Sequence, residues 1–128
     1  MLCDALPALG YLKDIATDTA TTDFEIPIPL AGATGYVVKY VTVYDAVGDN
    51  ELATIGVFTA AGGTGTTIVT NAALTGHDGA AADVSERTVI APATTLKVTA
   101  DSLYVRVGTA SGTAGSTISV IVHGYALP

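Results

Sequence analysis

The sequence predicts an all-β protein: an antiparallel β-sandwich of the jelly-roll-like or Greek-key kind, with an extended N-terminal arm. The apolar content is mostly Ala, Val, Ile and Leu beside abundant Thr and Gly, and the branched side chains of Val, Ile and Thr suit a pleated strand better than a helix. Turn residues separate short apolar segments at the spacing that a sandwich requires. No segment after the arm is long enough for the helical crossover that joins parallel strands, so the strands are expected to be antiparallel.

Residues 1–22 are expected to form the arm, and residues 23–128 the sandwich domain. Three leucines recur in this segment at helical spacing, namely Leu6, Leu9 and Leu12. Because Pro7 and Gly10 interrupt the pattern, at most a short turn of helix is expected there. We therefore predict that the three leucines contact a neighbouring protein.

Eight segments of the chain are typical of strands, namely residues 24–29, 36–44, 52–59, 66–69, 87–90, 96–99, 102–107 and 116–125. Pro27 and Pro29 cannot donate to a β-ladder, so the first of these strands is expected at a sheet edge. Residues 70–86 have no clear period and are predicted to form an exposed loop.

The strand at residues 36–44 has two apolar faces. Strict alternation sends Val37, Val41 and Val43 into the core and leaves Tyr36, Val38, Tyr40 and Tyr44 on the opposite face. Tyr125, in the last strand, lies on a second face of this kind with Ile121 and His123. Tyrosine offers a large contact area and keeps a hydroxyl for a wet rim, so Tyr36, Tyr40, Tyr44 and Tyr125 are candidate subunit contacts. Coverage by a loop or by the arm of the same chain is the alternative.

Charged residues make up 13% of the chain, and the net charge is −7. The five cations are scattered, which argues against binding to nucleic acid. An acidic surface is repelled by anionic lipid, and no apolar run is long enough to span a membrane. The N-terminus lacks the pattern of a secretory signal, so synthesis in a cytoplasm is expected. So few charges favour a subunit that hides much of its exterior in an assembly, although small neutral residues could also cover a free surface.

No motif for catalysis or metal binding is found. The densest group of oxygen-bearing side chains is Asp45, Asp49, Asn50 and Glu51, whose spacing fails the calcium-loop pattern and favours a solvated turn. His77, His123 and the single Cys3 are too few and too far apart for a zinc site. Cys3 is expected to be an inert thiol or an intermolecular crosslink. We therefore expect no enzyme activity and no cofactor.

Three stretches, residues 52–65, 102–110 and 122–127, resemble small virion proteins of tailed bacteriophages, most closely the capsid decoration (cement) proteins. The resemblance implies a homotrimer on the capsid surface of the virion, in contact with the major capsid protein, with the arm reaching a neighbouring subunit or the capsid floor. It carries over no functional residues. A tail, baseplate or head-fibre component is the first alternative. A carbohydrate-binding or adhesion module is the second, although the chain has no Trp to form a sugar platform.

Overall fold

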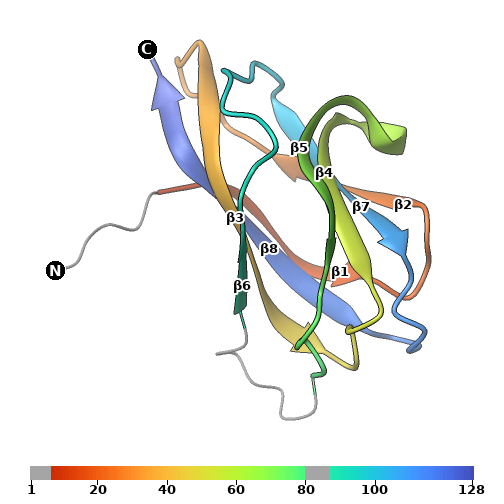
Figure 1. Ribbon diagram of the computed structural model, residues 1–128. Coiled ribbons are helices and arrows are strands. Elements are labelled where there is room, and N and C mark those ends of the chain that lie inside the picture. The colour runs from red at the N-terminus through yellow and green to blue at the C-terminus, as the bar shows by residue number, and fades with distance from the viewer. Residues whose placement is uncertain (1–6, 80–86) are drawn as a thin grey trace, which may run out of the picture.

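The computed structural model describes residues 7–79 and 87–128, and it is an all-β sandwich of two four-stranded antiparallel sheets (Figure 1). Sheet A has the strand order β1-β8-β3-β6, and sheet B has the order β2-β7-β4-β5. The strands are β1 (Ala8–Ala16), β2 (Thr22–Pro27), β3 (Gly35–Val47), β4 (Thr54–Ala60), β5 (Thr64–Ala73), β6 (Arg87–Ile90), β7 (Ser102–Thr109) and β8 (Thr117–Leu127). A 3-10 turn, η1 (Ala61–Gly63), joins β4 to β5. The predicted antiparallel β-sandwich is confirmed.

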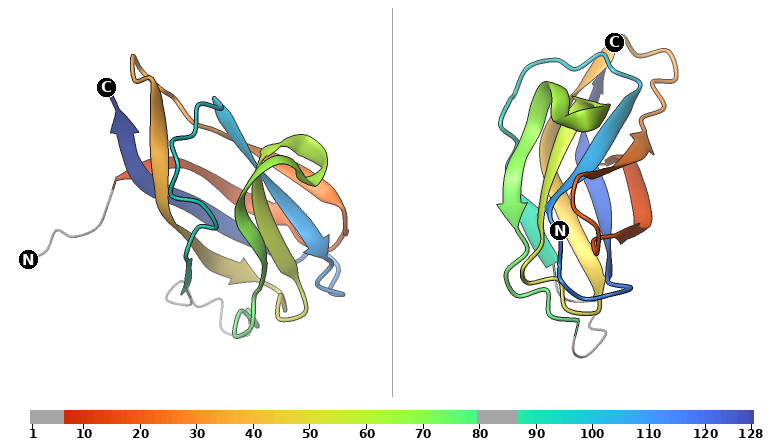
Figure 2. Two further views of the ribbon diagram at one scale, coloured as in Figure 1. Left: turned by 45° about the horizontal axis from the view of Figure 1, so that its top comes forward. Right: turned by 90° about the vertical axis from the view of Figure 1, so that its right-hand side faces the viewer.

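The strand pairs are nested: β1 pairs with β8, β2 with β7, β3 with β6 and β4 with β5. The chain therefore resembles one long hairpin that is folded into two layers, with β8 also pairing β3 and β7 also pairing β4. The right-hand view of Figure 2 shows β1 and β2 along one side of the sandwich and β5 and β6 along the other. The proline-containing strand β2 pairs only with β7, which confirms its predicted place at an edge.

The arm predicted over residues 1–22 is wrong where the structure describes it. Residues 8–16 form β1, an integral strand of sheet A that pairs with β8. β1 has one extra residue between Ala8 and Gly10 and another between Leu12 and Ile15, and Asp14 in the second bulge has a φ of 57°. Leu9, Leu12 and Ile15, which pack on the core, are consequently three apart, a spacing that resembles a helical period. Leu9 and Leu12 pack against the chain's own core, while Leu6 and Cys3 lie outside the described residues.

Gly10 allows β1 to close this side of the sandwich. A Cβ atom at this position would lie 2.6 Å from the carbonyl oxygen of Pro27 and 2.7 Å from Cδ1 of Ile28. No side chain fits at such distances, so only glycine lets the edges of the two sheets approach this closely.

Two further predictions need correction. Residues 96–99 form a single isolated bridge, Tyr36 to Val98, rather than a strand. The predicted loop at residues 70–86 begins inside β5, and two of its members, Leu74 and His77, are buried. Residues 80–86 of that loop lie outside the described part of the chain.

The core lies between the sheets and is built from Val, Ile and Leu side chains of both layers. The last two strands alternate strictly, because every second residue in them is fully buried: Leu103, Val105, Val107, Ile118, Val120 and Val122. This core fixes which side of each strand faces outward.

Candidate functional site

The outer face of sheet A carries a row of side chains across all four strands. Tyr11 on β1 pairs with Ile121 on β8, Ile121 pairs with Thr42 on β3, and Thr42 pairs with Val89 on β6. Residues opposite one another in an antiparallel pair point to the same side of the sheet. Since Val120 and Val122 point into the core, Ile121 and its whole row point outward.

A groove of about 450 Å³ lies along this face, lined by Tyr40, Thr42, Tyr44, Arg87, Val89, Ile121 and His123. Its walls are aromatic: the rings of Tyr40 and His123 are stacked with centroids 4.5 Å apart and planes inclined by 23°. Thr42, which is only 6% exposed, forms the floor. We call this surface the tyrosine face, and define it by Tyr11, Tyr40, Thr42, Tyr44, Val89, Ile121, His123 and Tyr125.

Large apolar side chains are unusually open on the tyrosine face. Tyr11 is 61% exposed, Val89 59% and Tyr125 42%. Among the described residues that line the groove, Arg87 alone carries a permanent charge, and it forms no ion pair with any residue that the structure describes. A large contiguous apolar surface of this kind marks an interaction site.

Of the tyrosines predicted to form contacts, Tyr40, Tyr44 and Tyr125 lie on this face, and Tyr36 does not. Lys39 is an extra residue in β3, between the pairs Val38–Gly124 and Tyr40–His123. This bulge reverses the alternation, so that Tyr36 and Val38 belong to the core cluster and Val37 does not.

Tyr36 is held inside the sandwich. Its side chain is fully buried, and its hydroxyl donates a hydrogen bond of 2.7 Å to the carbonyl oxygen of Ala100. Burial, and to a lesser extent the negative charge of Asp101, raises the pKa of Tyr36 to about 12. Tyr36 is therefore a neutral core residue with no surface for a partner, which corrects its assignment as an interface residue.

Five members of the tyrosine face were not predicted as contacts: Tyr11, Thr42, Val89, Ile121 and His123. Tyr11 fell within the supposed arm. Val89 lies in β6, a strand of only four residues, which is too short to show which side faces outward. A reading of β1 as a bulged strand would have placed Tyr11 beside Ile121.

The outer face of sheet B differs in chemistry. Arg106 donates to Asp23 at 2.7 Å across the β2–β7 pair, in the one salt bridge among the described residues. The hydroxyl of Ser102 donates to the carboxylate of Glu25 at 2.5 Å. The ring of Phe58 lies over Gly56, where a Cβ atom would be 2.9 Å from Cε1 of Phe58. This face thus carries polar contacts within the chain, while Oδ1 of Asp23 is buried without a hydrogen-bond partner among the described residues.

Asn50, which is fully buried, is the centre of a polar cluster. Its side-chain nitrogen donates to the carbonyl oxygens of Val47, Gly48 and Thr117, at 3.3, 3.1 and 3.1 Å. Its side-chain oxygen accepts from the hydroxyl of Thr17, which also bonds Ser116. The solvated turn predicted around Asn50 is therefore wrong for this residue, which clamps three chain segments together.

Three further candidates for metal binding, Asp49, Glu51 and His77, are used in local structure. A carboxylate oxygen of Asp49 accepts from the amide of Glu51, and one of Glu51 accepts from the amide of Gly76. His77 is 2% exposed and bonds the hydroxyl of Thr88 through Nε2 at 2.6 Å. Burial lowers the pKa of His77, so its imidazole is held neutral. In residues 7–79 and 87–128, no three His, Cys, Asp or Glu side chains gather where they could hold a metal ion.

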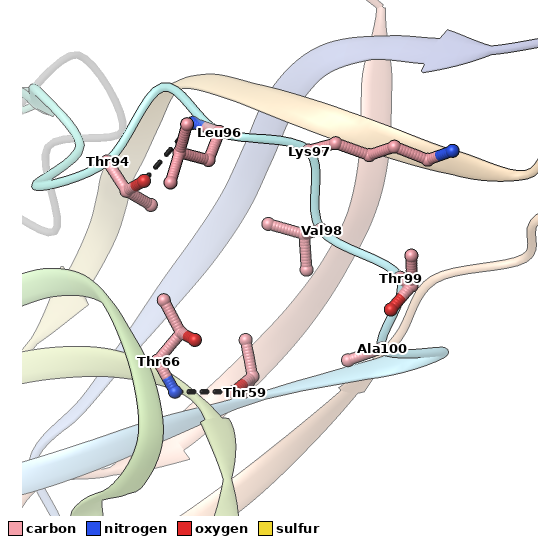
Figure 3. A pocket seen from close by; sticks show the side chains of 8 residues that line it. All are labelled: Thr59, Thr66, Thr94, Leu96, Lys97, Val98, Thr99 and Ala100. Carbon is pink, nitrogen blue, oxygen red and sulfur yellow. Dashed lines mark hydrogen bonds between the residues drawn. The ribbon is translucent and has the colours of Figure 1, made fainter.

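A second hollow, of about 200 Å³, lies between the β4–β5 hairpin and the segment before β7 (Figure 3). Four threonines line it, but Thr59 accepts from the amide of Thr66 and Thr94 accepts from the amide of Leu96. Lys97 turns its ammonium group to the hydroxyl of Thr34 at 2.7 Å. With these groups engaged and no aromatic ring in its lining, this hollow offers less for recognition than the tyrosine face.

Comparison with models of known protein families and with curated proteins finds no match to this chain. Within the part of the chain that the structure describes, there is no helix with the length and apolar character needed to cross a membrane. The tyrosine face is therefore the feature on which a functional argument rests.

Proposed function

We propose that this chain is a structural virion protein that decorates and stabilises a phage capsid through self-association and contacts with the major capsid protein. The observation that carries this proposal is the tyrosine face, which is aromatic and concave and has one charged side chain, Arg87, in the described lining of its groove. Interfaces between proteins are enriched in tyrosine and depleted in charge at their centre. The resemblance to decoration proteins supplies the virion as the setting.

The physical role follows from mass action. A protein that binds the assembled shell, and not its separated subunits, shifts the equilibrium toward the shell. Many identical contacts of moderate strength then add up to resistance against internal pressure. The resemblance implies three copies per assembly, and the mass of the purified chain in solution tests that number. The nested strand order supports the jelly-roll class for the sandwich.

Antibody labelling tests the location. Antibodies raised against the purified chain are incubated with particles of the phage that encodes it and are viewed by negative-stain electron microscopy. We expect label on the capsid. Label confined to the tail or baseplate would instead favour the first alternative, and particles without label would overturn a virion role.

A carbohydrate-binding module is the second candidate, because the stacked rings of Tyr40 and His123 border a concave groove. Sugars are recognised by aromatic platforms together with a few polar groups. A glycan array discriminates the two functions: the capsid proposal predicts no reproducible signal. A sugar that binds the unaltered chain but not a Tyr40→Ala variant would establish the second candidate.

A further inference from the structure

We infer that the tyrosine face binds the same face of a second copy of this chain, about a two-fold axis that runs along β8. This inference rests on the proposed function only in taking the tyrosine face as a protein contact. A two-fold contact brings the same patch of both subunits together, so the patch must be complementary to itself. The arrangement of large and small side chains across sheet A meets that requirement.

The first complementary pair is Tyr11 and Thr42. Both lie in the outward row that crosses sheet A, on the two strands that flank β8. An axis along β8 exchanges those two strands, so Tyr11 of each copy stands over Thr42 of the other. Tyr11 is 61% exposed and projects, whereas Thr42 is 6% exposed and forms the floor of the groove. The projecting ring of each copy thus enters the groove of the other.

A second pair repeats this relation in the reverse sense. In the next outward row, Tyr40 on β3 and Ala8 on β1 both pair with His123 on β8. The same axis places Tyr40 of each copy over Ala8 of the other. A large side chain again faces a small one, now with the large one on β3. The large residue lies on β1 in the first row and on β3 in the second, so the two sheets fit together in only one register.

Charge supplies an independent argument for this occupant. Tyr44 on β3 pairs with both Arg87 on β6 and Ser119 on β8, and the amide of Asp14 on β1 donates to the hydroxyl of Ser119 at 3.3 Å. These residues therefore share one level of the sheet. The axis carries β6 of one copy to a position just outside β1 of the other, so Arg87 comes to the level of Lys13 and Asp14, where the exposed carboxylate of Asp14 is its partner. The two copies form this contact twice.

The distribution of charge along the chain agrees with contact through sheet A. Its strands carry three of the five cations (Lys13, Lys39 and Arg87) and only two of the twelve carboxylates (Asp14 and Asp45). The excess of negative charge lies elsewhere, so a pair joined through sheet A keeps the acidic parts of its two copies apart. Such a pair differs from the trimer implied by the resemblance, because three-fold symmetry joins two different surfaces and needs no self-complementary patch.

An exchange of large and small residues tests the pairing. Sedimentation equilibrium of the full chain should give twice the mass of one copy, 12.8 kDa. Tyr11→Ala removes the projection and Thr42→Tyr fills the groove, and each is expected to weaken self-association at least about tenfold. The double variant places the ring of residue 42 in the space left at residue 11 of the other copy and should recover most of the lost affinity. Leu52→Ala, at another exposed apolar residue, should change nothing.

Crosslinking checks the axis directly. Facing sheets lie about 10 Å apart, which is too far for a disulfide, so a short bis-maleimide is used. In a Cys3→Ser background, the Ile121→Cys variant should crosslink to residue 121 of the second copy, because this residue lies on the axis. The Leu52→Cys variant should give no crosslink between copies.

A mass of one copy or of three copies for the unaltered chain, or a double variant no stronger than the single variants, would overturn the two-fold pairing. Far-UV circular dichroism confirms that each variant is folded before its mass is interpreted. The antibody experiment measures the location of the protein, and sedimentation measures its mass. A virion protein that does not pair can therefore be distinguished from a protein that pairs but is not in the virion.

Discussion

The two sheets of this sandwich have similar inner faces and different outer faces. Inside, both contribute rows of Val, Ile and Leu. Outside, sheet B pairs Arg106 with Asp23 and covers Gly56 with Phe58, whereas sheet A leaves Tyr11 and Val89 open to solvent. The inner faces are what the fold requires, and any folded sandwich has them. The outer faces are free to differ, so the one that is left apolar indicates function.

The largest expected effect comes from a residue that belongs to neither outer face. Asn50→Ala removes the clamp on three segments and leaves buried carbonyl groups and the hydroxyl of Thr17 without that partner. We expect the free energy of unfolding to fall by about 3 kcal/mol in urea titrations. Loss of the Asn50 side chain should destabilise both sheets alike. A variant with unchanged stability would show that the clamp is dispensable.

Enlarging a small residue should have opposite results on the two faces. Gly56→Val on sheet B forces the ring of Phe58 and the side chain of Asn71 to move, and is expected to destabilise the single chain by about 2 kcal/mol. Thr42→Tyr on sheet A extends into an open groove, so the stability of the single chain should stay within about 0.5 kcal/mol. Thermal unfolding at protein concentrations too low for self-association measures the stability of both variants. Equal losses of stability in the two variants would contradict the difference between the two outer faces.

Removing one arginine from each face sharpens the comparison further. Arg106→Ala leaves the half-buried carboxylate of Asp23 without its cation, and should cost about 1 kcal/mol. Arg87→Ala should cost the single chain less than about 0.5 kcal/mol, because no described residue forms a salt bridge with it. Its effect should instead be weaker self-association at low salt. If Arg87→Ala destabilises the chain as much as Arg106→Ala does, then Arg87 is bound within its own subunit.

The smallest expected effect is a dependence on pH at one edge of sheet A. Burial lowers the pKa of His77 below its ordinary value of 6.5. The unfolded chain therefore binds a proton more readily than the folded chain, so stability from this group is present above about pH 6.5 and is lost as pH falls. Since the imidazole of His77 hydrogen-bonds the hydroxyl of Thr88 on β6, the amide protection factors in β6, which correct for the intrinsic exchange rate at each pH, should fall between pH 7 and pH 5 more than those in β7. His77→Gln should remove this difference, and β6 protection factors that are independent of pH would contradict the assignment.

Much of the fold could be predicted because the strands in the centre of the sandwich obey simple alternation. In β7 and β8, each core residue is followed by an outward one without interruption, and both were assigned correctly. The edge strand β1 and residues 96–99, which belong to the connection from sheet A to sheet B, were harder to predict. Residues 8–16 look like an interrupted helix because a bulge lies within them, and residues 96–99 look like a strand although a single bridge holds them.

The candidate site was predicted in part for a similar reason. Tyr40, Tyr44 and Tyr125 were placed on an outward face, and the structure brings them to one side of sheet A. Tyr36 was assigned to the same face, but the extra residue at Lys39 turns it into the core. A bulge changes which side a residue faces, and nothing in the local sequence announces it. Tyr11 joins the site only because β1 adds to the sheet beside β8.

The sequence by itself determined the all-β class, the antiparallel pairing and the presence of tyrosines that the core does not need, because these depend on residue type and on a period of two. Only the tertiary structure decided where the bulges fall, that the N-terminal segment is a strand, and that one outer face collects four of the six tyrosines. The physical reason is that a bulge and a strand partner are chosen by the packing of distant segments, and one extra residue reverses the side of every residue that follows it.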